Sequence, residues 1–122
     1  MTLVLANFKV PRDDSEAYLA NLRQLPCVVC GNPAPNTVHH LKATGRRGIG
    51  LKSPDRYGLP MCWFPAGEHC HNQIEAIGSK HELEWLAERG IEALDLCDRL
   101  WTVRNSLAAM RLVLWESLYD GK

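Results

Sequence analysis

The sequence lacks an excess of charge of either sign, long hydrophobic runs and internal repeats. Its 14 basic and 14 acidic side chains give a formal net charge of zero, so the molecule as a whole offers no electrostatic argument for binding nucleic acid or a membrane surface. No apolar stretch approaches the roughly 18 residues of a membrane span. The opening segment MTLVLANFKV has only a short apolar run and no basic region before it, so we expect no secretion signal. These absences favour a cytoplasmic protein without a membrane partner.

The length of 122 residues corresponds to one domain, small enough for a bound metal ion to matter to its stability. We therefore interpret residues 1–122 as a single domain. A helix is expected near the start, because the side chains of residues 13–15 offer N-cap oxygens and Pro26 ends the run. Two short strands are expected, over residues 37–42 and 57–62.

The C-terminal part of the sequence predicts helices. One should cover SKHELEWLAERG, capped by Ser79 and stopped by Gly90, and a longer one should run from about Ile91 to Tyr119. On the longer helix, apolar side chains recur alternately every three and four residues. We expect this stripe to pack on the rest of the domain; the alternative is a homodimer seam of about two and a half heptads. The stripe consists of Leu96, Leu100, Val103, Leu107, Met110 and Leu114.

The five cysteines point to a metal site. In a chain without a secretion signal, cysteines spaced as Cys27-x2-Cys30 favour metal thiolates over a disulfide framework. The tight turn directs two thiolates at one ion, and tetrahedral zinc needs two more ligands, of which Cys62 is the obvious third. The fourth is Cys70 or His69, and we favour Cys70. The sequence therefore predicts a closed structural Zn²⁺ site that holds the fold together.

The stretch GEHCHNQIE, residues 67–75, carries ligands for a second ion. His71 and Glu75 are four residues apart, which places both side chains on one face of a helix. This pair needs an outside ligand, and the candidates are His39 and His40. Adjacent residues on a strand point apart, so one imidazole should bind metal and the other stay free to accept a proton. Imidazole suits the second role because its unperturbed pKa is about 6.5.

The charge that the whole chain lacks appears locally between the two expected strands. The segment KATGRRGIGLKSPDR, residues 42–56, carries five basic side chains, one acid and three glycines. Basic side chains neutralise phosphates and glycines allow close backbone approach, so we expect this segment to bind nucleic acid. We interpret the lone acid, Asp55, as an orienting or loop-closing group. The basic side chains are Lys42, Arg46, Arg47, Lys52 and Arg56.

The order of these motifs resembles that of the HNH (ββα-metal) endonucleases: Cys27-x2-Cys30, then HHL at residues 39–41, then GLPMC and HCHNQIE. More narrowly, the chain is similar to the phage and prophage group that includes the recombination enhancement function nuclease, through RQLPCVVCG and GIGLKSPD. The resemblance covers about residues 14–90. It implies an α+β fold, a small zinc-stapled ββα-metal domain with a flanking N-terminal helix and long C-terminal helices, of which residues 91–119 form an extension.

The resemblance also implies roles for single residues. His39 would be the metal ligand of the histidine pair and His40 the general base, while His71 and Glu75 would complete the catalytic metal site. The implied activity is hydrolysis of DNA phosphodiester bonds with one divalent ion, Mg²⁺, Mn²⁺, Ni²⁺ or Zn²⁺. The implied partners are DNA and a recombinase filament. The alternative, from another class of protein, is a non-catalytic zinc module that binds nucleic acid or a protein partner.

Overall fold

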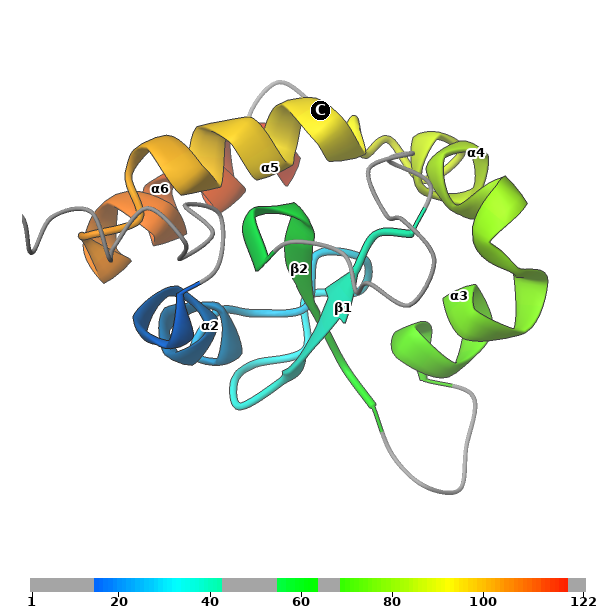
Figure 1. Cartoon of the computed structure of the whole chain (residues 1–122), viewed down its shortest axis with the longest axis horizontal. Coiled ribbons are helices and arrows are strands. Elements are labelled where there is room, and N and C mark those ends of the chain that lie inside the picture. The colour runs from blue at the N-terminus through cyan, green and yellow to red at the C-terminus, as the bar shows by residue number, and fades with distance from the viewer. Residues whose placement is uncertain (1–14, 43–54, 64–68, 119–122) are drawn as a thin grey trace, which may run out of the picture.

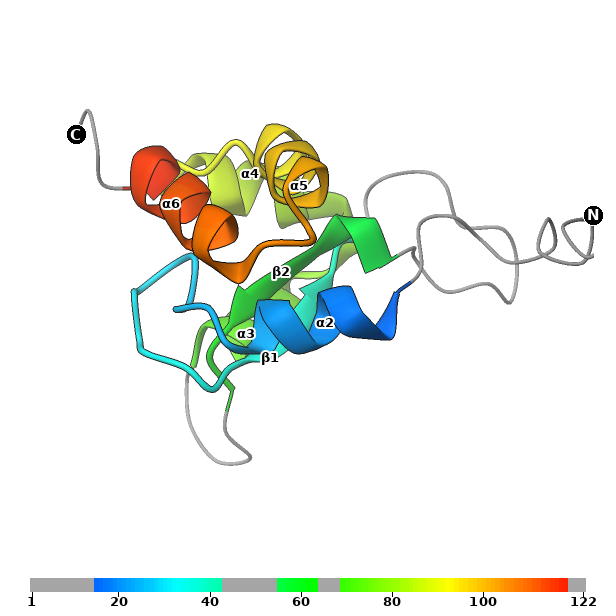
Figure 2. The same ribbon diagram turned by 90° about the vertical axis from the view of Figure 1, so that its left-hand side faces the viewer.

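The computed structural model describes residues 15–42, 55–63 and 69–118. This part of the chain is a small α+β unit, mostly helical, with one two-stranded sheet at its centre (Figure 1). Turned by 90°, α4, α5 and α6 lie on one side of β2 and α2 lies on the other (Figure 2). The elements in chain order are α2 (Glu16–Arg23), β1 (Thr37–His40), η1 (Asp55–Tyr57), β2 (Gly58–Met61), α3 (Cys70–Ile77), η2 (Ser79–His81), α4 (Glu82–Ala87), α5 (Ala93–Thr102) and α6 (Leu107–Leu118).

Helix α2 begins where the sequence predicts a helix. Ser15 has extended backbone, and its side chain accepts a hydrogen bond from the backbone N–H of Tyr18 at 3.2 Å, which makes it the N-cap. Tyr18, Leu19 and Leu22 share the buried face of the helix. The prediction of a capped, amphipathic helix here is confirmed, and its burial seats α2 against the sheet.

Both expected strands are present and pair antiparallel. His39 lies opposite Leu59, and His40 lies opposite Gly58. A Cβ atom added to Gly58 would lie 2.7 Å from Cγ1 of Val38 and 3.2 Å from the backbone oxygen of Asp55. Only glycine therefore lets the start of β2 approach β1 this closely, and this approach brings Asp55 beside the strand that carries the two histidines.

The prediction of a single long helix from Ile91 to Tyr119 is wrong. Helix α5 ends at Thr102, and α6 begins only at Leu107. Ser106 caps α6, since its side chain accepts a hydrogen bond from the backbone N–H of Ala109 at 3.1 Å. The chain turns between the two helices, so both lie on the same side of the sheet (Figure 2). This arrangement buries most of the predicted apolar stripe within the chain, as expected for a stripe that packs on the rest of the domain. The buried members are Leu96, Leu100, Met110 and Leu114.

The helix expected over residues 79–90 is shorter than predicted. Residues 79–81 form the short 3-10 helix η2, and α4 follows as far as Ala87. Neither element has a side-chain cap, so the expected role of Ser79 as an N-cap is wrong. Gly90 has a φ of 80°, a conformation that glycine adopts without strain, and it reverses the chain into α5 as the sequence predicts.

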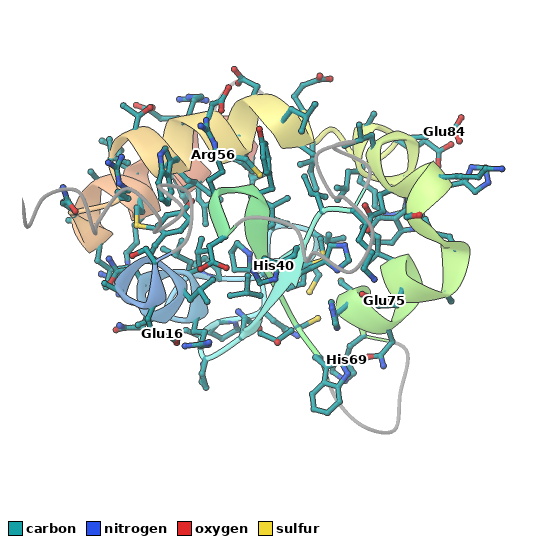
Figure 3. All side chains as sticks on the ribbon, in the orientation of Figure 1. Glu16, His40, Arg56, His69, Glu75 and Glu84 are labelled. Carbon is teal, nitrogen blue, oxygen red and sulfur yellow. The ribbon has the colours of Figure 1, made fainter. Side chains whose placement is uncertain are left out.

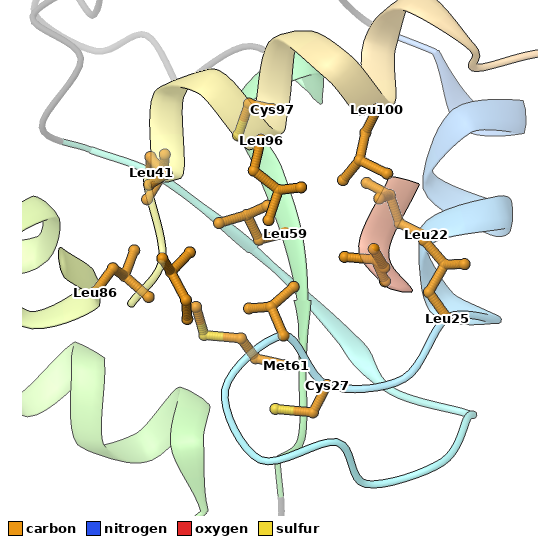
Figure 4. Close-up of a cluster of buried hydrophobic side chains, with 14 of the residues drawn as sticks. Leu22, Leu25, Cys27, Leu41, Leu59, Met61, Leu86, Leu96, Cys97 and Leu100 are labelled. Carbon is orange, nitrogen blue, oxygen red and sulfur yellow. The ribbon is translucent and has the colours of Figure 1, made fainter. Parts of the chain in front are cut away.

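Buried apolar side chains from all layers form one cluster (Figure 4). Leu59 and Met61 of β2 lie in its middle, and Leu86, Leu96 and Leu100 approach them from α4 and α5. Burial of this apolar area from several elements is the main stabilising contribution to such a fold. Within the described ranges, no helix combines the length and the apolar character needed to cross a membrane.

Candidate functional site

The four cysteines that the spacing predicts as ligands come together. The sulfur atoms of Cys27, Cys30, Cys62 and Cys70 all lie within 4.8 Å of one another, and those of Cys30 and Cys62 are 3.7 Å apart. A tetrahedral Zn²⁺ with Zn–S bonds of about 2.3 Å has its sulfur atoms about 3.8 Å apart. A disulfide requires about 2.05 Å, so these cysteines are free thiols. The cluster can therefore hold a structural metal such as zinc.

The backbone around the four-cysteine cluster forms a tight turn and directs N–H groups at two of the sulfur atoms. The turn from Cys27 is closed by the N–H of Gly31, which donates to the Cys27 carbonyl at 2.9 Å, and Gly31 has a φ of 80°. Backbone N–H groups also approach two of the sulfurs at 3.4 Å, from Val29 to Cys27 and from Cys70 to Cys62. Such N–H donors stabilise thiolate, the form of cysteine that binds metal.

Three of the four thiols do not ionise at the same pH, because burial, mutual repulsion and hydrogen bonds shift their pKa values in different directions. Burial acts to raise the pKa of Cys62, but hydrogen bonds from the backbone of Cys70 and from the His69 side chain bring it down to about 6. Burial and the charge of Cys27 raise the pKa of Cys70 and of Cys30 above the ordinary thiol value. A divalent cation at the centre removes this conflict by compensating all four charges. His69 thus acts as a hydrogen-bond donor to Cys62, while Cys70 is the fourth member of the cluster.

A second cluster contains His39, His71 and Glu75, with one potential ligand atom of each within 4.8 Å of the others. Oε2 of Glu75 lies 3.3 Å from Nδ1 of His39 and 3.5 Å from Nε2 of His71. Neighbouring ligands on an ion with bonds of about 2.1 Å are separated by about 3.0 Å in octahedral and about 3.4 Å in tetrahedral geometry. The 3.3 Å separation lies between these two values, and the 3.5 Å separation lies just above the tetrahedral one.

The donor atoms of this cluster also suit a cation chemically. Nδ1 of His39 is buried and makes no hydrogen bond within the described part of the chain, although the carboxylate of Glu75 is near it. Burial, followed by the charge of His39, lowers the pKa of His71. For Glu75, burial acts to raise the pKa, but the hydrogen bond and charge of Lys42 hold it below the ordinary value. A neutral imidazole and an ionised carboxylate are the protonation states in which these side chains bind metal.

Glu82 also contacts this cluster, through His39, and belongs to none of the motifs predicted from the sequence. Only 1% of Glu82 is exposed; its Oε2 lies 2.7 Å from Nε2 of His39, and its Oε1 accepts the backbone N–H of Lys42 at 2.7 Å. In the sequence, the acidic residues between positions 79 and 90 have the pattern of an exposed helix face. The sequence did offer one indication that Glu82 is buried: it precedes the apolar Trp85 and Leu86 by three and four residues and so shares their buried face.

His40 lies apart from this second cluster, in contact with a different acid. Its Nε2 is 2.9 Å from Oδ1 of Asp55, and Oδ2 of Asp55 accepts the backbone N–H of Ser15 at 2.8 Å. Asp55 is buried, whereas 28% of the His40 side chain is exposed. An ionised carboxylate only accepts hydrogen bonds, so it holds a proton on Nε2 and leaves Nδ1 of the neutral ring as the acceptor. Figure 3 shows His40 over the sheet and Glu75 on α3 beside it.

The basic side chains predicted to bind nucleic acid occupy different surroundings. Nζ of Lys42 lies 3.0 and 3.2 Å from the two carboxylate oxygens of Glu75, at the edge of the second cluster. Arg56 forms an ion pair with Asp98 and so connects η1 to α5. The other basic residues of the prediction lie outside the described residues: Arg46, Arg47 and Lys52.

Comparisons with known proteins add a family but no activity. A family model described as "Protein of unknown function (DUF968)" matches residues 3–98. The chain is similar to "Uncharacterized protein YdfU" of Escherichia coli (strain K12), with 40% identity over 47 residues. That match covers 38% of this chain and only 13% of the length of the relative. No solved structure gives a significant match.

Proposed function

The chain belongs to the DUF968 family, and we propose that it is a metal-dependent endonuclease that hydrolyses DNA phosphodiester bonds with a histidine general base. The observation that carries this proposal is the division of the two neighbouring histidines of β1. His39 joins a cluster of three potential metal ligands, and His40 contacts a separate carboxylate. The order of β1, β2 and α3 around the cluster also agrees with the resemblance to HNH endonucleases.

In this proposal the four-cysteine cluster holds a structural Zn²⁺. Its thiolates come from the turn after α2, the end of β2 and the start of α3. A site with four protein ligands leaves no open position for a substrate, so its role is to join these segments. It thereby holds His71 and Glu75, on α3, near His39 on β1.

The chain's own residues supply the proton transfer. Nδ1 of His40 accepts a proton from the attacking water while the oxygen of that water bonds to phosphorus and the bond to the 3′ oxygen breaks. Asp55 holds the ring in place through Nε2 and stabilises the imidazolium that forms. A divalent ion at His39, His71 and Glu75 would supply positive charge to the phosphate and the leaving oxygen.

The mixed nitrogen and oxygen donor set accepts Mg²⁺, Mn²⁺, Ni²⁺ or Zn²⁺. Lys42 lies at the edge of the cluster, where its ammonium group can reach a phosphate of the bound DNA. We include Arg46, Arg47 and Lys52 in the DNA-binding surface, and Arg56 with a smaller share because it already pairs with Asp98. A recombinase filament as partner and a phage origin rest on the resemblance alone.

The test is a plasmid-nicking assay with His40→Ala. The variant should fold and keep its zinc but nick supercoiled DNA about 10² to 10⁴ times more slowly, because general-base catalysis is lost. His81→Ala is the matched control, since the His81 side chain is largely exposed and forms an ion pair with Glu84 of the adjoining α4, away from both clusters. Nicking by His40→Ala at the wild-type rate would overturn the assignment of the base.

A second candidate is a non-catalytic zinc module that binds nucleic acid. One contact favours it: the carboxylate of Glu75 is already neutralised by Lys42 within the chain. The two functions separate in one experiment, in which purified protein is offered DNA with each of the four divalent ions. Tight binding without any strand cleavage supports the module, and cleavage that disappears on removal of the added ion supports the endonuclease.

A further inference from the structure

We propose that Glu82 is the positioning residue of the second metal centre, because it fixes the proton of His39 on Nε2 and so directs an unprotonated Nδ1 toward His71 and Glu75. This inference rests on the metal centre of the proposed function. It concerns metal binding, however, and can be tested without any DNA cleavage.

Glu82 is buried, although its side chain carries a carboxylate. A carboxylate removed from water is strongly destabilising unless hydrogen bonds or charges compensate it. Glu82 is 1% exposed, on the face of α4 that also buries Trp85 and Leu86. Apolar packing alone gives no reason for a charged side chain on this face of α4. The contacts of the carboxylate therefore explain its presence.

Those contacts use both carboxylate oxygens as acceptors. Oε1 receives the backbone N–H of Lys42, and Oε2 faces Nε2 of His39, each at 2.7 Å. Because an ionised carboxylate has no proton to give, Nε2 must be the donor. The hydrogen bond from Lys42, which follows β1 by two residues, holds the carboxylate close to the strand that carries His39. The carboxylate and the imidazole ring therefore keep one relative orientation.

The position of the proton decides whether His39 can bind metal. Its side chain is 1% exposed, so bulk water does not compete for the ring nitrogens. Nδ1 is buried without a hydrogen bond, 3.3 Å from Oε2 of Glu75. With the proton on Nε2, Nδ1 presents a lone pair to the cluster; with the proton on Nδ1, the ring is not a ligand. Carboxylates that hold metal-binding histidines in this way raise metal affinity substantially.

Substitution of Glu82 by glutamine separates this role from packing. The amide has the same shape but only one acceptor oxygen for the two donors, Lys42 N–H and His39 Nε2–H. If the oxygen bonds Lys42, the NH₂ group faces Nε2 and favours the proton on Nδ1. The variant therefore loses either the ring orientation or the strand contact, although no cavity is created.

The experiment measures Mn²⁺ binding to zinc-loaded protein by electron paramagnetic resonance. Mn²⁺ is weakly competitive for thiolates, so it reports the second site. Glu82→Gln should bind Mn²⁺ about 10 to 100 times more weakly than wild type, with unchanged zinc content. Glu84→Gln is the matched control, because Glu84 lies two residues away on the outer surface of α4 (Figure 3). It should bind as wild type does.

A spectroscopic measurement on the wild type keeps the inference testable if Glu82→Gln does not fold. Nitrogen-15 NMR at pH 8 without added Mn²⁺ should show His39 protonated at Nε2. Protonation at Nδ1, wild-type Mn²⁺ affinity in Glu82→Gln, or a wild-type protein that takes up no Mn²⁺ would each overturn the inference. A wild type that binds Mn²⁺ but never cleaves DNA would refute the endonuclease and leave the role of Glu82 intact.

Discussion

Replacement of Cys70 by serine should unfold the region around α3, because Cys70 is one of the two buried side chains of that helix and joins it to the cysteine cluster. Within α3, only Cys70 and Ile74 are buried. The helix nevertheless carries His71 and Glu75, so the second cluster depends on its position. A serine hydroxyl is not ionised at neutral pH and is a poor zinc ligand. The substitution therefore removes one of four thiolates without a substitute.

The expected loss is large compared with the stability of the fold. Structural zinc contributes about 10–16 kcal/mol in small zinc domains, whereas a domain of this size is stable by about 5–15 kcal/mol. Burial of the Ile74 side chain contributes only about 1.5–3 kcal/mol. Even the loss of half the zinc contribution thus approaches the whole net stability, and Ile74 cannot compensate for it.

The assay combines thermal unfolding by circular dichroism with zinc content from a chromogenic chelator. Cys70→Ser should contain less than one zinc per chain and lose its cooperative transition. Cys97→Ala is the matched control, because Cys97 is also a buried thiol but lies outside the cluster, and its loss should cost about 1 kcal/mol. A Cys70→Ser protein that retains one zinc and unfolds at the temperature of Cys97→Ala would refute the reasoning.

Three further changes test other contacts. Asp55→Asn should slow plasmid nicking about 10² to 10⁴ times, because one amide oxygen cannot serve both His40 and Ser15; an unchanged rate would remove Asp55 from the mechanism. Lys42→Met should tighten Mn²⁺ binding about two- to fivefold, since a half-exposed ion pair no longer competes for Glu75, and weaker binding would contradict this. Gly58→Ala should lower the free energy of unfolding by about 1–3 kcal/mol in urea titrations because its Cβ would clash with Val38, whereas a neutral effect would mean that the strands can separate.

Local chemistry made much of this fold predictable from sequence. Ser15 is an N-cap followed by an amphipathic run, and the two short strands are bounded by loop residues. The four cysteines and the pair His71 and Glu75 stood out because these residue types at these spacings are typical of metal ligands, while the choice of His39 over His40 came from the resemblance to HNH endonucleases. The capping and strand signals, and the spacing within each pair of ligands, depend on near neighbours in the chain.

The features that were wrong or missed depend on tertiary packing. The apolar period of the C-terminal segment continues through residues 103–106, because α5 and α6 pack on the same core, and it concealed the turn. The N-cap potential of Ser106 was the local sign of that break. Glu82 was missed because its partners are 40 and 43 residues away in the chain, and its spacing from Trp85 and Leu86 indicates only a shared helix face, not a partner.

The pairing of β1 with β2 places two identical side chains in different surroundings. His39 and His40 are separated by a single peptide unit, yet one ring meets Glu82 and the other meets Asp55. A slip of one residue in the pairing would carry only one ring into the place of the other and bring Val38 or Leu41 to the remaining position, so one of the two contacts would be lost. Composition would be unchanged, and so would the number of imidazoles. The register of the four residue pairs therefore decides which of the two histidines faces Glu82 and which faces Asp55.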